Sequence, residues 1–295
     1  MKKSVSLLLA GLMLCGALAG CGGSNDSAES TTSTDTESTG TSGAIHVVSR
    51  EDGSGTRGAF VELTGVEDDN GDNTTVEAEI ANRTDAVLTT VAGNEAAIGY
   101  VSLGSLNDTV KAVTVDGVEA TVDNVKSGDY TLSRPFNIAT KGEPTGVAAD
   151  FINFIMSADG QAIVGEDYIT VNDNAEAFTS DGSSGHITVG GSSSVSPVME
   201  QLIEAYKAVN PNAQIDLQTS DSTSGMTGAM DGTFAIGMAS RELKDEEAAE
   251  LTGTAIALDG IAVIVNTGNT VDNLTMDQIR SIYVGETTDW ADVAA

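Results

Sequence analysis

Small hydroxyl residues recur in four short segments of this chain, three of which also contain glycine and two an arginine. The segments are residues 49–56 (SREDGSGT), 190–194 (GGSSS), 220–225 (SDSTSG) and 240–241 (SR). Hydroxyls and backbone N–H groups donate hydrogen bonds without bulk, and an arginine adds a forked donor pair that is always charged. Together such groups can bind a tetrahedral oxyanion. For any single segment the commoner role of Ser, Thr and Gly is an ordinary helix cap or turn, and that alternative stays open.

These segments need elements that bring them together. Short β-rich stretches alternate with helical ones, which favours an α/β architecture with largely parallel sheets. We predict strands at 45–49, 96–102, 110–115, 187–190, 213–218, 233–238 and 255–266, helices at 147–156 and 197–209, and a helix-capping box at 275–278. Sheets of this kind bind ligands at the carboxyl ends of their strands, where the next helix presents unpaired N–H groups. We therefore expect the four segments to meet at such an edge.

Length and charge exclude several function classes. The chain has 295 residues, enough for one large domain or two medium lobes, and carries 44 acidic against 13 basic side chains, a net charge of −31. Polyphosphate would be repelled, so we predict no nucleic-acid partner. Twelve aromatic residues are also too few for a base-stacking platform.

The first 43 residues are set apart from the fold. Residues 1–20 combine two lysines with a short apolar run, which is typical of a secretion signal. The run ends in LAGC, which resembles the lipobox of bacterial lipoproteins and implies that Cys21 carries a lipid. Residues 21–43 then form a flexible linker rich in Ser, Thr and Gly. We expect a lipid-anchored protein on the outer face of the cytoplasmic membrane, with its folded part free of thiols.

An enzyme is the rival interpretation, with Ser54 or Ser193 as nucleophile. Such a serine needs an adjacent base, usually a histidine. Only His46 and His186 occur, both at predicted strand starts, and no G-x-S-x-G is present. We therefore predict no catalysis and no cofactor. The acidic run at residues 67–72 (EDDNGD) lacks EF-hand spacing, so we predict a solvated loop and no metal. A surface protein without a small ligand is a further alternative.

Several motifs resemble one family. Residues 49–60 (SREDGSGTRGAF) are similar to the signature loop of the phosphate-binding lipoproteins that supply phosphate-specific ABC importers. The further similar segments are ITVGGSSSVSPVMEQLIEAY (187–206), IGMASREL (236–243), IALDGIAVIVN (256–266) and LTMDQIRSIYVGETTDW (274–290). The resemblance implies a two-lobed periplasmic-binding-protein fold of the Venus-flytrap type. It also implies a monomer with phosphate in its cleft and an ABC permease as partner.

The order of the segments departs from that family's usual order. There GSSSV opens the chain and FINFIMSADGQAIVGEDYI closes it, whereas here the closing segment at 151–169 comes first. We predict a circular permutation with residues 181–185 as the new linker. A fusion of two half-proteins or an incorrectly assembled gene model is the alternative. Carried over to this order, the family's lobes are 134–180 plus 186–261 (lobe A) and 44–133 plus 262–295 (lobe B).

The resemblance and the loop chemistry together assign the phosphate ligands. The expected donors are Arg50, Ser54, Gly55 and Thr56 from lobe B, and Ser193, Ser194, Thr223 and Ser240 from lobe A. Asp52 is expected to accept the proton of hydrogen phosphate, which sulfate lacks. Many relatives have an aspartate where Ser240 stands, which weakens the expected discrimination. Another tetrahedral oxyanion, such as a sulfate-like ion or a phosphonate, is therefore the alternative ligand.

Overall fold

The computed structural model describes residues 41–293. The predicted signal segment, Cys21 and nearly all of the predicted linker lie outside the described residues. Within the described part, the chain ends lie side by side. The Ile45 amide donates to the Thr288 carbonyl at 2.8 Å, and Ala44 forms a β-bridge with Asp289. The first strand therefore begins beside the last turn of the chain.

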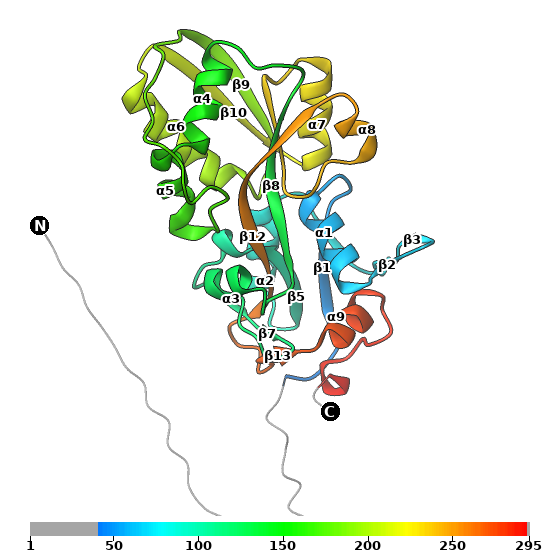
Figure 1. The fold of residues 1–295 in the computed structure, drawn as a ribbon. Coiled ribbons are helices and arrows are strands. Elements are labelled where there is room, and N and C mark those ends of the chain that lie inside the picture. The colour runs from blue at the N-terminus through cyan, green and yellow to red at the C-terminus, as the bar shows by residue number, and fades with distance from the viewer. Residues whose placement is uncertain (1–40, 294–295) are drawn as a thin grey trace, which may run out of the picture. The chain divides into compact units, whose positions relative to one another are not determined.

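A nine-stranded mixed sheet runs through both halves of the molecule (Figure 1). Its eight-strand path follows the order β10-β9-β11-β8-β12-β5-β1-β4, and β6 pairs with β12 beside it. These strands are β1 (His46–Arg50), β4 (Glu79–Ala81), β5 (Ala97–Ser102), β6 (Val110–Ala112), β8 (Ser133–Thr140), β9 (Gly185–Ser192), β10 (Ala213–Ser220), β11 (Ile236–Ala239) and β12 (Thr252–Asn266). Two small sheets pair β2 (Glu67–Asp68) with β3 (Gly71–Asp72) and β7 (Thr114–Val115) with β13 (Asn273–Leu274).

The expectation of largely parallel sheets is only half right. The outer pairs β10–β9, β9–β11, β5–β1 and β1–β4 are parallel, but β8 and β12 are antiparallel to every strand they pair with. Strand β12 is 15 residues long, and its first part pairs with β8 while its last part pairs with β5. These two long strands pass between the upper and lower lobes (Figure 1).

Helices flank the strands in both lobes (Figure 1). The lower lobe carries α1 (Gly55–Thr64), α2 (Thr84–Ala92), α3 (Val122–Ser127) and α9 (Met276–Tyr283), and the upper lobe carries α4 (Val147–Met156), α5 (Ala158–Asp167), α6 (Ser196–Val209), α7 (Ser222–Asp231) and α8 (Asp245–Ala248). Short 3₁₀ turns are η1 (Leu103–Ser105) and η2 (Trp290–Asp292). Thr275 and Gln278 form the predicted capping box of α9.

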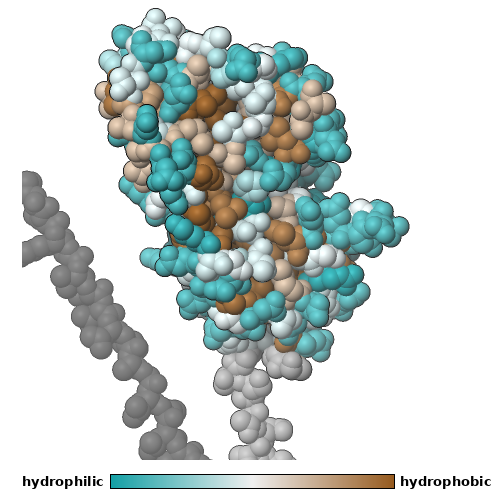
Figure 2. Space-filling model, in the orientation of Figure 1, coloured by the Kyte–Doolittle hydropathy of each residue, from teal (hydrophilic) through white to brown (hydrophobic). Residues whose placement is uncertain are grey.

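Each lobe has its own hydrophobic core. In the lower lobe, Phe60 of α1, Tyr100 of β5 and Tyr283 of α9 pack together, with the Phe60 and Tyr100 rings stacked at 3.9 Å. In the upper lobe, Phe151 of α4 packs against Tyr206 of α6 at a ring separation of 5.0 Å. On the face shown in Figure 2, hydrophilic residues cover most of the rim and hydrophobic ones gather toward the middle. The residue bounds predicted for lobes A and B, with 181–185 as linker, stay a prediction.

Candidate oxyanion-binding site

The SREDGSGT loop connects the end of β1 to the start of α1. Arg50 is the last residue of β1, and Gly53 adopts a left-handed backbone (φ 86°) that turns the chain toward the helix. The Ser54 hydroxyl caps α1 by accepting the Arg57 amide hydrogen at 3.3 Å. Gly55 and Thr56 follow as the first helical residues. Local turn chemistry therefore directs this segment to the carboxyl end of β1, as the sequence predicts.

Three turns of the upper lobe face this loop. Ser193 and Ser194 follow β9 and precede α6, and Ser240 follows β11. Ser222 begins α7, whose N-terminus is capped by the Asp221 carboxylate accepting the Ser224 amide hydrogen at 2.8 Å. All three turns lie at carboxyl ends of parallel strands, where unpaired helix N–H groups collect.

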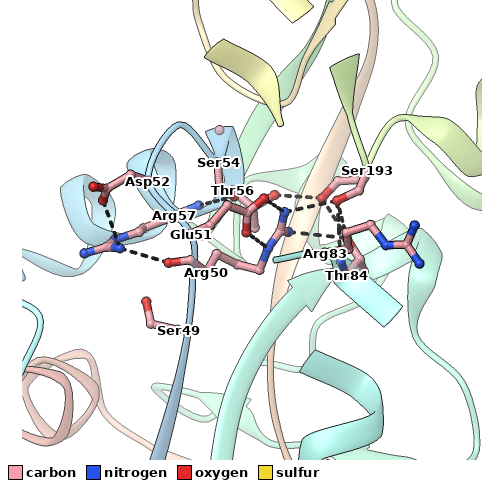
Figure 3. Close-up of polar contacts among 12 residues, drawn as sticks. Ser49, Arg50, Glu51, Asp52, Ser54, Thr56, Arg57, Arg83, Thr84 and Ser193 are labelled. Carbon is pink, nitrogen blue, oxygen red and sulfur yellow. Dashed lines mark hydrogen bonds and ion pairs between the residues drawn. The ribbon is translucent and has the colours of Figure 1, made fainter. Parts of the chain in front are cut away.

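Arg50 and Thr56 contact the opposite lobe directly (Figure 3). Arg50 Nη2 donates to Ser193 Oγ at 3.0 Å, and the arginine is only 2% exposed. Thr56 Oγ1 lies 2.8 Å from Ser194 Oγ and 3.2 Å from Ser240 Oγ. The structure thus brings a buried guanidinium and four hydroxyl groups from two lobes into one network.

Glycine at position 55 permits this close approach. A Cβ atom added there would overlap the Ser222 hydroxyl and would lie 2.9 Å from Ser240 Oγ. The Gly55 amide instead donates to Ser222 Oγ at 3.2 Å. At the same rim, the Thr223 amide donates to the Gly53 carbonyl at 3.1 Å. A larger residue at position 55 would therefore require the Ser222 and Ser240 hydroxyls to move.

A carboxylate adjoins the buried guanidinium. Arg50 Nε and Nη2 donate to the two carboxylate oxygens of Glu51 at 2.7 and 2.8 Å, and the Glu51 side chain is 16% exposed. Among residues 41–293, Arg50 Nη1 has one hydrogen-bond partner, the hydroxyl of Thr84 at 3.4 Å, and Thr84 is the first residue of α2. The guanidinium therefore retains hydrogen-bonding capacity at Nη1, on the side of α2.

The predicted residues do not all enter this network. Asp52 has a fully exposed side chain that pairs with Arg57 at 3.3 Å (Figure 3). It points outward because the chain turns at Gly53, so no contact supports the expected role of Asp52 as acceptor of a ligand proton. Thr223 is also peripheral, since its hydroxyl donates to the Gly53 carbonyl and accepts from Arg241. Ser54 serves as a helix cap. The roles of these three residues stay predictions.

Two cavities border the site from either side. One of about 400 Å³ is lined by Thr84, Ser193, Ser196 and other residues of both lobes. The other, of about 180 Å³, is lined by Ser54, Thr223 and neighbouring charged residues. A larger cavity of about 650 Å³ runs along α6 and β10 and contains none of the predicted site residues.

The two histidines lie away from the serines. His46 starts β1, about 13 Å along the strand from Arg50 at about 3.3 Å per residue, and its ring pairs with Glu79 at 2.8 Å. His186 lies near the start of β9 and pairs with Asp216 at 2.8 Å. Among residues 41–293, no group of three or more Asp, Glu, His or Cys side chains is placed to hold a metal ion. The described helices include none that is both long and apolar enough to cross a bilayer.

Comparison with known proteins decides the family. The sequence model of the PBP superfamily domain matches residues 25–159 and 176–295. Phosphate-binding protein PstS 2 of Streptococcus agalactiae is 48% identical over 300 residues, which cover 99% of this chain and 98% of that protein. This chain belongs to the PstS family within the PBP superfamily. PstS 2 of Streptococcus pneumoniae is 45% identical over 294 residues, 98% of both chains.

A solved structure supports the same assignment. The crystal structure of a phosphate ABC transporter, phosphate-binding protein from Streptococcus pneumoniae aligns with a TM-score of 0.69 at 46% identity. It covers 85% of this chain and 100% of that one. The predicted periplasmic-binding-protein fold of this PstS family member is thereby confirmed. Because its streptococcal relatives match over nearly their whole length, they share its order of segments. The circular permutation relative to other PstS proteins stays a prediction.

The structure of this PstS family member places four further residues around the site that the sequence analysis did not name. Thr84 carries the same small-hydroxyl signal at the start of α2, and Ser222, at the start of α7, lies inside segment 220–225 but was not named as a ligand. Arg134 and Asp259 form a buried ion pair on β8 and β12, and Arg134 Nη2 donates to Thr56 Oγ1 at 3.2 Å. Arg134 is one of only six arginines beyond the predicted signal segment. Because arginines are so few, each one could have been considered as a candidate for the anion site.

Burial works against both charges of this pair. It raises the pKa of Asp259 and lowers the pKa of Arg134, while their mutual attraction and a hydrogen bond from Ser102 to Asp259 oppose those shifts. Arginine nevertheless remains charged in proteins. The charged guanidinium of Arg134 therefore lies within hydrogen-bonding distance of Thr56, which faces the upper lobe.

Proposed function

We propose that this protein binds inorganic phosphate outside the cytoplasm and delivers it to the permease of an ABC importer. The observation that carries the proposal is the meeting of Arg50 with Ser193 across the lobes at 3.0 Å. The Nη1 group of Arg50 can donate a charge-assisted hydrogen bond to a phosphate oxygen, and hydroxyls from the facing lobe complete a tetrahedral donor set. The names of the close relatives point to the same ligand.

The donor set suits an anion that bridges the lobes. Arg50 supplies the charge, Thr56 supplies a hydroxyl at the start of α1, and Ser193, Ser194 and Ser240 supply hydroxyls from the other side. An anion held by both lobes stabilises the closed arrangement by its differential affinity for it, as in hinge-type binding proteins. Closure then signals the loaded state to a permease.

The strong negative charge of the chain is compatible with anion binding. Salt screens exposed charges that lie farther from the site than the Debye length, about 8 Å at physiological ionic strength, so much of the net charge of −31 has little effect on a bound anion. Inside the cleft the nearest groups decide, and charge-assisted hydrogen bonds are stronger than neutral ones. Micromolar affinity, about −8 kcal/mol, is within reach of such a set.

Selectivity is assigned to Glu51. It is the carboxylate that the structure places against Arg50, whereas Asp52 faces solvent. Hydrogen phosphate can donate a proton to a carboxylate, and sulfate cannot. The alternative ligand is another tetrahedral oxyanion, such as a sulfate-like ion or a phosphonate.

Isothermal titration calorimetry with phosphate, arsenate, sulfate and a simple phosphonate tests the proposal. We expect micromolar or tighter binding of phosphate and at least tenfold weaker binding of sulfate. Absence of heat with all four ions, confirmed by equilibrium dialysis with labelled phosphate, would favour a surface protein without a small ligand. Preferential binding of the phosphonate or of sulfate would replace phosphate as the ligand.

Catalysis and membrane attachment are separate parts of the proposal. We propose no enzymatic turnover, because each histidine lies at the opposite end of its strand from the serines. Hydrolysis of a generic ester or phosphoester would contradict this proposal.

We also propose a monomer anchored by a lipid on Cys21. Metabolic labelling with a palmitate analogue should mark the wild type and not a Cys21→Ala variant.

A further inference from the structure

Arg134 occupies the point where the two lobes are joined. It is the second residue of β8, 4% exposed, and its register partner on β12 is Asp259, which is fully buried. Both strands pass from one lobe to the other (Figure 1). The pair therefore lies in the connection between lobes and not in the loops that form the proposed anion site.

The contacts of Arg134 reach in two directions. Nη1 bonds to the Asp259 carboxylate and donates to the Gly260 carbonyl at 2.8 Å, which fixes the side chain on β12. Nη2 donates to Thr56 Oγ1 at 3.2 Å. The guanidinium also lies over the Phe136 ring at 5.0 Å from its centroid. One rigid, planar group thus ties the crossing strands to the first turn of α1.

Hydrogen-bond accounting shows what this contact does to Thr56. A guanidinium has only donors, so Thr56 Oγ1 must accept from Arg134. A hydroxyl has a single hydrogen, and this one must then be donated elsewhere. Its neighbours are Ser194 Oγ at 2.8 Å and Ser240 Oγ at 3.2 Å, on the side where the proposed anion binds.

We propose that Arg134 is a positioning residue for anion binding. It fixes the Thr56 hydroxyl as a donor toward the cleft, and Asp259 with Ser102 holds Arg134 in place for that task. Without Arg134, the Thr56 hydroxyl would have no charged donor to accept from. Its hydrogen could then rotate away from the anion. The inference rests on the proposed phosphate function and adds a role for residues outside the ligand loops.

A double-mutant cycle separates this role from a merely structural one. Removing Arg134 alone would leave Asp259 buried and unpaired, which is strongly destabilising. Both charges are therefore removed together, in the double variant Arg134→Met/Asp259→Asn. This change is made once with Thr56 present and once together with Thr56→Val. Phosphate affinity is measured by calorimetry for all four proteins, and thermal unfolding is followed in parallel.

We expect neutralisation of the pair to weaken phosphate binding about tenfold when Thr56 is present and less than twofold when position 56 is valine. Equal loss in both backgrounds, or no loss in either, would overturn the positioning role. Failure of the wild type to bind phosphate would instead overturn the proposed function. The two failures can be told apart, because phosphate binding by the wild type tests the proposed function before any variant tests the role of Arg134.

A second variant covers the case in which the neutralised pair does not fold. Arg134→Lys keeps a charge beside Asp259, but an ammonium lacks the second arm of the guanidinium fork. We expect it to fold and to lose phosphate affinity at least threefold with Thr56, but not with valine at position 56. Unchanged affinity of the folded Arg134→Lys protein would contradict the proposal.

Discussion

Arg50 and Ser193 are 143 positions apart in the chain, yet Arg50 Nη2 donates to Ser193 Oγ at 3.0 Å. Arg50 ends a strand of the lower lobe, and Ser193 follows a strand of the upper lobe. Their contact joins the two lobes at the carboxyl ends of parallel strands, where the loops meet. The first prediction concerns this contact.

Replacing Arg50 by alanine should weaken phosphate binding at least tenfold, because the buried positive charge and its Nη1 donor are lost. Arg280→Ala is a matched control, since Arg280 is a partly exposed residue of α9 that pairs with Glu286 at 3.9 Å and lines neither cavity beside the site. Calorimetry should give near wild-type affinity for that control. Unchanged affinity in a folded Arg50→Ala protein would remove Arg50 from the site.

Glu51→Gln should lower the preference for phosphate over sulfate. The amide cannot accept a ligand proton as strongly as the carboxylate, and it no longer balances the Arg50 charge. We expect sulfate binding to strengthen relative to phosphate by at least tenfold. Asp52→Asn is the control and should leave the ratio unchanged, because Asp52 is fully exposed. The opposite pattern in competition titrations would restore Asp52 to its expected role.

Gly55→Ala should weaken phosphate binding by preventing closure. The added methyl would overlap the Ser222 hydroxyl and meet Ser240 Oγ at 2.9 Å. Gly58→Ala lies one turn further along α1 and meets only Arg241 Cδ, at 4.0 Å. It should retain affinity and gain up to about 1 kcal/mol of stability from better helix propensity. Small-angle scattering should show compaction with phosphate for Gly58→Ala and not for Gly55→Ala.

Asp150 should contribute stability that disappears in acid. Burial alone would raise the pKa of Asp150, but hydrogen bonds from the Asp181 amide, Ser180, Tyr206 and Asn210 outweigh it and lower the pKa below its usual value. The folded state therefore favours the carboxylate. Its stabilisation is complete above the unfolded pKa of about 4 and is lost as the pH falls through the lower folded value.

Asp150→Asn should accordingly reduce the free energy of unfolding by about 1–3 kcal/mol at pH 7, since it disrupts hydrogen bonds to a buried charge. The difference from wild type should shrink below pH 4. Asp108→Asn, at an exposed loop position, should change little at any pH. Urea unfolding at pH 7 and pH 3 measures both differences. A pH-independent loss would mean that shape, and not charge, matters at position 150.

Local signals predicted three of the nine α-helices among the described residues, namely α4, α6 and, through its capping box, α9. The predicted helix at 147–156 matches α4, and 197–209 differs from α6 by one residue, because apolar residues recur on one face of each. Gly, Ser and Thr marked the loops at helix starts for the same local reason. Strand β8 was not among the predicted strands, and its Pro135 is of a type that is rare inside a central strand. Pro135 is tolerated because β11 pairs only with Asn137–Ala139, leaving β12 alone beside the proline.

The sequence by itself determined which residue types could bind an oxyanion and which turns would carry them, because caps, glycines and periodic apolar faces act over a few residues. Tertiary structure alone decided that Glu51 and not Asp52 lies against Arg50, and that Arg134 reaches Thr56. Those contacts depend on side-chain direction and on the antiparallel pairing of β8 with β12. Neither can be read from spacing along the chain, since both arise only when distant strands meet.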